Sequence, residues 1–139
     1  MNKIYCFSLL FFISIIGSSQ NFKTGTFKVF ESQRYNPNDE QDKTEWLKID
    51  RTFIIKQDFI IFYYGTTDEL RLNFKYVKQI NSEKYLSHQL RGLSGTAEYI
   101  TVTFSCPKNE NADSFYILNV CPEGTFTKQA LRFKMRFVK

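Results

Sequence analysis

The chain has 139 residues, of which 17% are Phe, Trp or Tyr and 24% are charged. This length fits one domain built on one hydrophobic core and excludes a second domain of ordinary size. There are 19 Lys and Arg residues against 14 Asp and Glu, and the resulting net charge of +5 is too mild to point to nucleic acid or to any other partner.

The first nineteen residues have the pattern of a secretory signal peptide. Lys3 precedes an apolar run over residues 4–16, and the small residues 17–19 follow it. The run is shorter than the roughly 20 apolar residues that span a bilayer, so a cleaved signal is favoured over an uncleaved anchor. We expect cleavage at Ser19-Gln20, a single all-β domain over residues 20–139, no transmembrane anchor after processing, and a secreted, periplasmic or cell-envelope location.

Apolar and polar residues alternate with a period of two through much of the remaining chain, which predicts strands with one buried and one solvated face. Four runs show this alternation clearly. Their apolar positions are Leu47, Ile49, Phe53 and Ile55; Leu70, Leu72, Phe74 and Tyr76; Ile100, Val102 and Phe104; and Leu131, Phe133, Met135 and Phe137.

Turn signals separate the predicted strands. Lys56-Gln57-Asp58 predicts a tight hairpin, and residues 65–68, 107–113 and 122–124 predict three further turns. The polar residues 34–44 predict a loop.

One segment has helical spacing. Leu86 and Leu90 are four residues apart, Asn81 or Ser82 could cap the start and Gly92 could end it, so we expect one short helix over residues 81–92. Seven or eight short strands with about one short helix predict an all-β fold, either a small antiparallel β-barrel or a closed sandwich.

The run Phe59 to Tyr64 (FIIFYY) is apolar on both faces. Such a strand is either covered on both sides by the rest of the protein or has one face lining an aromatic ligand cavity. The second interpretation makes Phe59, Phe62 and Tyr64 candidate ligand-binding residues, and the sequence leaves both interpretations open.

The sequence Gly25-Thr26-Phe27, at the start of the first predicted strand, is similar to the Gly-x-Trp start of lipocalin-type (calycin) barrels, with Phe in place of Trp. The size of the chain and the predicted strand number are similar too. The resemblance implies a small barrel that holds a ligand.

Cys106 and Cys121 are the two cysteines outside the predicted signal peptide. Export permits a disulfide between them. In a hairpin around residues 107–113, position 106 lies opposite 114, which puts the cysteines about 23 Å apart on opposite faces of the sheet. A bridge needs Cα atoms within about 7 Å, so either this hairpin is wrong or no simple disulfide forms.

The sequence contains no pattern typical of a catalytic or metal site. His88 is the single histidine and is expected on the surface, and the side chain of the adjacent Ser87 points away from it. The oxygen-rich residues 36–45 lack the spacing and the glycine of a calcium loop and are expected to be a solvated acidic loop. We therefore expect no enzyme, no cofactor and no metal.

Arg132, Lys134 and Arg136 share the polar face of the last predicted strand. Such a row either binds an anionic surface or glycan, or protects a strand edge and keeps the protein soluble. The aromatic residues of this strand are on its other face, unlike in proteins that bind single-stranded nucleic acid, so no nucleic-acid partner is expected.

These features favour an exported, non-enzymatic binding module for a small apolar ligand or for an envelope protein or glycan. The alternative is a structural or interaction protein of the cell envelope that docks through its basic C-terminal strand and has no ligand pocket. An enzyme ranks third, because no set of residues has catalytic spacing.

Overall fold

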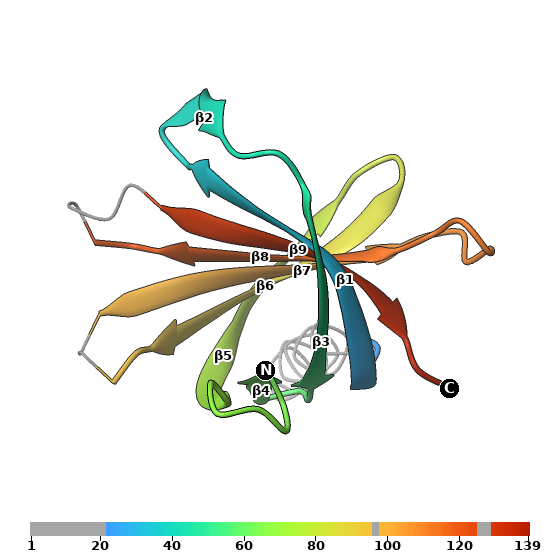
Figure 1. Cartoon of the computed structure of the whole chain (residues 1–139), viewed down its shortest axis with the longest axis horizontal. Helices are drawn as coiled ribbons and strands as arrows, with labels where there is room; N and C mark the ends of the chain where they lie inside the picture. The colour runs from blue at the N-terminus through green and yellow to red at the C-terminus, as the bar shows by residue number, and fades with distance from the viewer. Residues whose placement is uncertain (1–21, 96–97, 125–128) are drawn as a thin grey trace, which may run out of the picture.

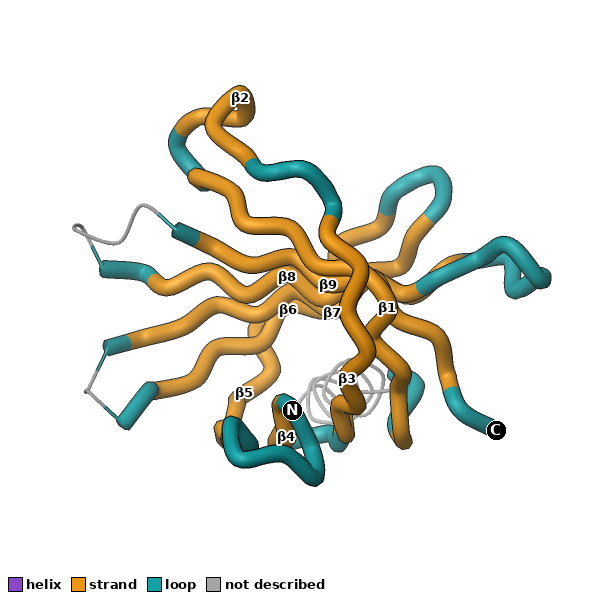
Figure 2. The backbone as a smooth tube through the Cα atoms, in the orientation of Figure 1, coloured by secondary structure: helices purple, strands orange, loops and turns teal. Residues whose placement is uncertain are grey.

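The computed structural model describes residues 22–95, 98–124 and 129–139, and over these ranges it contains nine antiparallel strands and no helix (Figure 1, Figure 2). The predicted all-β class is confirmed. The strands are β1 (Gly25–Asn36), β2 (Asp39–Lys43), β3 (Leu47–Ile55), β4 (Phe59–Phe62), β5 (Leu70–Asn81), β6 (Tyr85–Leu93), β7 (Tyr99–Pro107), β8 (Tyr116–Pro122) and β9 (Ala130–Phe137).

Eight of these strands form a closed barrel. Each strand from β3 to β8 pairs with the next strand in sequence, β1 pairs with β3, and pairing between β1 and β9 completes the ring. The short β2 pairs only with β1 and projects from the barrel in an exposed hairpin, as Figure 1 shows. Of the two predicted architectures, the barrel is therefore confirmed.

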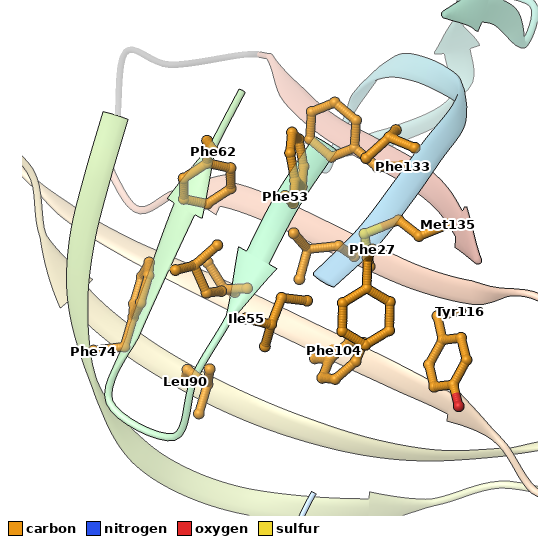
Figure 3. Close-up of a cluster of buried hydrophobic side chains, with 14 of the residues drawn as sticks. Phe27, Phe53, Ile55, Phe62, Phe74, Leu90, Phe104, Tyr116, Phe133 and Met135 are labelled. Carbon is orange, nitrogen blue, oxygen red and sulfur yellow. The ribbon is translucent and has the colours of Figure 1, made fainter. Parts of the chain in front are cut away.

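The interior of the barrel is filled mainly by aromatic and aliphatic side chains, several of which are drawn in Figure 3. Those from β3, β5, β7 and β9 belong to the apolar faces that the alternation predicted, and the others come from β1, β4, β6, β8 and Phe22. Ring centroids lie 5.4 Å apart for Phe27 and Phe104, and 4.9 Å apart for Phe53 and Phe133, both in edge-to-face geometry. Pairs of this kind contribute about 0.5–1.5 kcal/mol each beyond the apolar area that they bury.

The Gly25-Thr26-Phe27 segment opens β1 at a close approach to β9. Phe27 is fully buried. Gly25 has φ +142°, and a Cβ added to Gly25 would lie 2.7 Å from the ring of Phe137. Glycine is required here both by the backbone conformation and by the neighbouring ring.

A bulge at Phe30 reverses the sidedness of β1. Val29 lies opposite Met135 and Glu31 lies opposite Lys134, so Phe30 is an extra residue in β1 relative to β9. Before the bulge the odd-numbered residues point into the barrel, and after it they point outward. The outer face of β1 consequently carries Phe30 and Glu31 side by side, which the sequence pattern did not predict.

The predicted helix over residues 81–92 is wrong. Residues 82–84 form a turn in which the Ser82 hydroxyl bonds to the carbonyl of Tyr85, and β6 follows. Leu86 and Leu90 share a face in a strand as well as in a helix, because a spacing of four fits both periods. Gly92 lies within β6, where a Cβ would be 2.6 Å from the Phe74 ring.

The predicted loop over residues 34–44 is also partly wrong, because it contains the end of β1 and the whole of β2. All five residues of β2 are exposed. A strand that projects from the barrel needs no apolar face, so its sequence lacks the alternation by which strands are recognised. The hairpin predicted at residues 56–58 is confirmed, with the Lys56 amide bonded to the Phe59 carbonyl at 2.9 Å.

The two ends of the barrel differ. At one end, where β1 starts and β9 ends, Phe22 packs into the interior against His88 and Phe104, with ring centroids 5.1 and 5.9 Å away. The Gln57 side chain fixes this segment by donating to the Phe22 carbonyl at 3.1 Å. This end is closed by the chain itself, and we call the other the open end.

Candidate functional site

An apolar cavity of about 140 Å³ lies at the open end of the barrel. Its walls come from the loop-facing ends of β4, β5, β7, β8 and β9, so that five strands contribute to one site. The lining residues are all apolar or aromatic: Phe62, Tyr63, Leu70, Leu72, Ile100, Val120, Leu131 and Phe133.

Tyr63 is the residue that gives this cavity its shape. Its φ is +52°, in the left-handed region that a non-glycine residue seldom adopts. The consequence is that Phe62 and Tyr63, although consecutive, both pack in the barrel, and the Tyr63 ring lies 5.3 Å from Phe53 and 6.3 Å from Phe133. A backbone conformation that costs about 1–3 kcal/mol persists only where its surroundings enforce it, and such residues cluster at ligand sites.

The turn after β4 holds Tyr63 in this conformation. The Tyr64 amide donates to the Thr52 carbonyl at 2.7 Å, and the Thr66 hydroxyl donates to the Tyr63 carbonyl at 2.8 Å. Gly65, with φ +78°, allows the chain to turn back, and its amide bonds to the Glu69 carboxylate at 2.9 Å.

The cavity has an apolar interior and a polar rim. Burial raises the pKa of the Tyr63 hydroxyl, while the nearby positive charge of Arg51 opposes that shift and Asp68 adds to it. An apolar cavity of about 150 Å³ in another protein stays dry and binds benzene, so the present cavity has room for a group of that size. It is smaller than the roughly 300–1,000 Å³ of sites that enclose a whole drug-sized molecule.

Of the three predicted ligand-binding residues, the structure brings only Phe62 into the cavity. Phe59 lies on the outer face of β4, where the Arg71 guanidinium sits 3.8 Å from its ring centroid. Tyr64 is 50% exposed in the turn. Sequence reasoning missed Tyr63, because strict alternation after Phe62 assigns it to the outside, and only the positive φ turns it inward.

A larger hollow, about 660 Å³, lies outside the barrel interior, where β5 changes its partner from β6 to β4. Among its lining residues, the Arg91 guanidinium is already stacked on Tyr99 at 3.8 Å and paired with Glu123 at 2.9 Å. The divergence of two strands accounts for this notch, so the smaller cavity is the better candidate site.

The prediction that His88 lies on the surface is wrong. His88 is 1% exposed and points into the closed end of the barrel, with its Nδ1 3.0 Å from the Tyr76 hydroxyl. Burial lowers the pKa of the imidazole. Ser87 points the other way and pairs with the Ser105 hydroxyl at 2.7 Å, so the two neighbouring side chains diverge as expected.

Both cysteines are free thiols. Cys121 lies opposite Thr101 in the β7–β8 hairpin, so it is at the far end of the hairpin from Cys106. The register differs by two residues from the expected one, which does not bring the cysteines together. Burial raises the pKa of the Cys106 thiol to about 11, which keeps it protonated and unreactive near neutral pH.

The row of basic residues on β9 is stacked on aromatic rings. Arg132 lies 4.2 Å from the ring centroid of Tyr35, and Arg136 lies 4.1 Å from that of Phe30. Lys134 lies between two rings, 4.2 Å from Trp46 and 5.1 Å from Phe115. We call these seven residues the outer belt.

The aromatic residues of β9 itself lie on the opposite face from this basic row, as expected. The rings of the outer belt come from other parts of the chain. Tyr35 and Phe30 belong to β1, Trp46 lies between β2 and β3, and Phe115 directly precedes β8. Only the closed fold places them beside β9.

The β2 hairpin carries acidic residues of the segment that was expected to be a solvated loop. Their side chains bond within the hairpin, for example Asn36 Nδ2 to Asp42 at 3.3 Å, and the Asp39 carboxylate accepts from the Gln41 amide at 3.1 Å. In the parts of the chain that the structure describes, no group of three or more His, Cys, Asp or Glu side chains could hold a metal ion.

Residues 1–19 and the expected cleavage point lie outside the described residues. Over the described ranges there is no helix long and apolar enough to span a membrane. Comparisons with family models, with curated proteins and with solved structures gave no match.

Proposed function

We propose that the chain is a non-enzymatic binding module that holds a small apolar ligand at the open end of its barrel. The observation that carries this proposal is the position of Tyr63, whose strained backbone turns a second aromatic ring beside Phe62 onto an apolar cavity of about 140 Å³. A ring placed only for packing could follow the ordinary alternation without this strain.

The ligand that suits this cavity has an apolar part about as large as a benzene ring or a short branched chain. The walls offer almost no hydrogen-bonding groups, so a polar group of the ligand belongs at the rim near Tyr63 and Arg51. Binding would be driven by removing apolar surface from water, at roughly 25 cal/mol per Å².

The same proposal includes a calycin-type barrel and an exported location. The closed eight-strand ring and the Gly25-Thr26-Phe27 start of β1 support the first, since Gly25 is sterically required and Phe27 is a core residue. The signal-like residues 1–19 support the second. In that location the ligand would be a molecule of the envelope or of the surroundings.

Benzene is a suitable probe because it matches the cavity volume. At saturating benzene we expect the melting temperature of the processed protein to rise by several degrees, since a ligand that binds only the folded state stabilises it. Val120→Phe fills the cavity from β8 and should abolish the rise. Leu93→Phe adds the same ring at a 51% exposed position outside the barrel and should keep it.

An equal rise in the Val120→Phe variant would show that benzene binds elsewhere, and no rise in the unmodified protein would contradict the proposal. Native mass spectrometry of protein purified from its own cells adds an independent measurement. A co-purified small molecule that is absent from the Val120→Phe variant is the expected result.

A further inference from the structure

We propose that the outer belt binds an acidic polysaccharide lying along β9. The belt is on the outside of the barrel, so this inference is independent of the cavity and of the ligand proposed for it. It rests on the stacking of the cations, on the charge of the surrounding face and on the spacing of the charges along the strand.

Stacking holds the cations in place while leaving their charge available. The Arg136 guanidinium lies against Phe30 at 4.1 Å, and none of the four ion pairs among the described residues involves it. A guanidinium with a ring against its face keeps its N–H groups directed outward in its own plane, where they can bond to sulfate or carboxylate oxygens. Holding the side chain in advance also reduces the entropy lost on binding.

The other two cations of the belt are only weakly compensated. Lys134 has Glu31 at 4.0 Å, the outer limit of an ion pair. The Arg132 guanidinium bonds to the neutral side-chain oxygen of Gln33 at 3.1 Å. That amide in turn donates to the Thr44 carbonyl at 2.9 Å, which fixes its position from the other side.

The surrounding face is positively charged as well. Lys28 lies beside Arg136 on β1, and Lys48 lies beside Glu31 on β3. The carboxylates beside the row are Glu31 and Asp50, the latter paired with Lys28 at 3.4 Å. Glu40 and Glu110 line the hollows at the two ends of the row, together with Lys43, Lys23 and Lys139, so cations still exceed carboxylates over this face. A face with this excess attracts a polyanion and repels other basic surfaces.

The spacing along β9 suits a linear polymer. Residues two apart on a strand are about 6.8 Å apart, so the three cations span about 14 Å in a straight row. The two ends of the row are hollowed: Arg132 lines a depression of about 280 Å³ under the β2 hairpin, and Arg136 lines one of about 370 Å³ beside the β7–β8 loop. A chain with repeated negative groups can follow this row.

A polysaccharide fits the belt better than single-stranded nucleic acid does. Nucleic-acid binders stack bases on free aromatic faces. In the belt each ring already has a cation against its face, and Phe30 and Phe115 are in edge contact with centroids 6.2 Å apart. Recognition therefore depends on the charged N–H groups, with the ring edges offering apolar contact to a sugar backbone.

Trp46 gives a direct readout, because it is the single tryptophan of the chain and Lys134 lies against its ring. We expect titration with heparin, a sulfated glycan, to change the tryptophan emission saturably, and salt to weaken the effect. Polygalacturonate, which carries carboxylates in place of sulfates, should give the same change at higher concentration. An oligothymidylate should bind at least ten-fold more weakly than heparin.

The variant Lys134→Gln/Arg136→Gln removes two belt charges and keeps the aliphatic stems. We expect it to weaken heparin binding at least ten-fold. Lys56→Gln/Lys78→Gln removes two exposed charges away from the belt, one in the β3–β4 turn and one on β5, and should change the affinity by less than two-fold. The proposal would be overturned if both double variants lost heparin affinity equally. It would also be overturned if heparin left the tryptophan emission unchanged, or if the oligothymidylate bound more tightly than heparin. Isothermal titration, which does not depend on Trp46, provides the affinities.

Discussion

At the scale of single residues, His88 is the least expected feature of the barrel. An imidazole that is 1% exposed has lost nearly all contact with water, and its Nδ1 lies 3.0 Å from the Tyr76 hydroxyl. Phe22 and Phe104 pack around it without offering a charge that could compensate a proton. Burial therefore favours the neutral imidazole and lowers its pKa.

This predicts that stability falls in mildly acidic solution. In the unfolded chain His88 binds a proton near its ordinary pKa of about 6.5, while the folded protein resists protonation to lower pH. The contribution of the neutral His88 to the free energy of unfolding is fully present above pH 6.5. It is lost as the pH falls from there toward the pKa of His88 in the folded protein, by at most about 1.4 kcal/mol per pH unit. Urea unfolding between pH 7.5 and 5 measures it.

The variant His88→Gln can still bond to Tyr76 but cannot titrate. Its free energy of unfolding should therefore decline less steeply than that of the unmodified protein between pH 7.5 and 5. Tyr76→Phe removes the hydroxyl and keeps the histidine, so it should retain the steep decline. Parallel pH profiles for the unmodified protein and His88→Gln would contradict the interpretation.

The inside and outside of a strand could be predicted residue by residue wherever the backbone is regular. Phe74, Phe104 and Phe133 point inward, as the alternation indicated. Tyr63 could not be predicted, because its direction depends on a positive φ that several tertiary hydrogen bonds enforce. The residue most important for the candidate cavity is thus the one at which the local rule fails.

At the scale of elements, the clear alternation identified four of the nine described strands, β3, β5, β7 and β9. A spacing of four between Leu86 and Leu90 fits a strand and a helix equally, and only pairing with β5 and β7 decides between them. The outer belt could not be predicted from the sequence for another reason. Its rings come from residues 30, 35, 46 and 115, and neither the bulge nor the closure that brings them to β9 has a signal in the sequence.

The strand β4 offers a direct test of which face is the inner one. Phe62→Ala removes a ring that is 5% exposed and packed on Phe53 at 5.2 Å, and should lower the free energy of unfolding by about 3–5 kcal/mol. Phe59→Ala removes an identical ring from the outer face, where its main partner is Arg71, and should cost about 1 kcal/mol or less. Urea unfolding of the two variants measures the difference, and equal losses would mean that β4 has both faces covered.

At the scale of the whole molecule, ring closure separates two surfaces with different chemistry. The inner faces of the strands supply apolar side chains to the core and the cavity, and the outer faces of β1 and β9 supply cations and rings to the belt. Because side chains alternate along each strand, residues that serve one surface are interleaved with residues that serve the other. The two proposed sites can therefore be altered independently, one residue apart on β9, at Phe133 and Lys134.

The β2 hairpin is outside this ring, and the barrel should not need it. Among the strands β2 contacts only β1, and all of its residues are exposed. Replacing residues 37–42 by the two-residue turn Asn-Gly keeps Gln33 and its bond to the Thr44 carbonyl, so the melting temperature should change by only a few degrees. Circular dichroism should show one cooperative transition with an unchanged β-sheet spectrum. A broad transition, or loss of the spectrum, would mean that the hairpin helps to close the barrel, and β1–β9 pairing alone would then be insufficient for the fold.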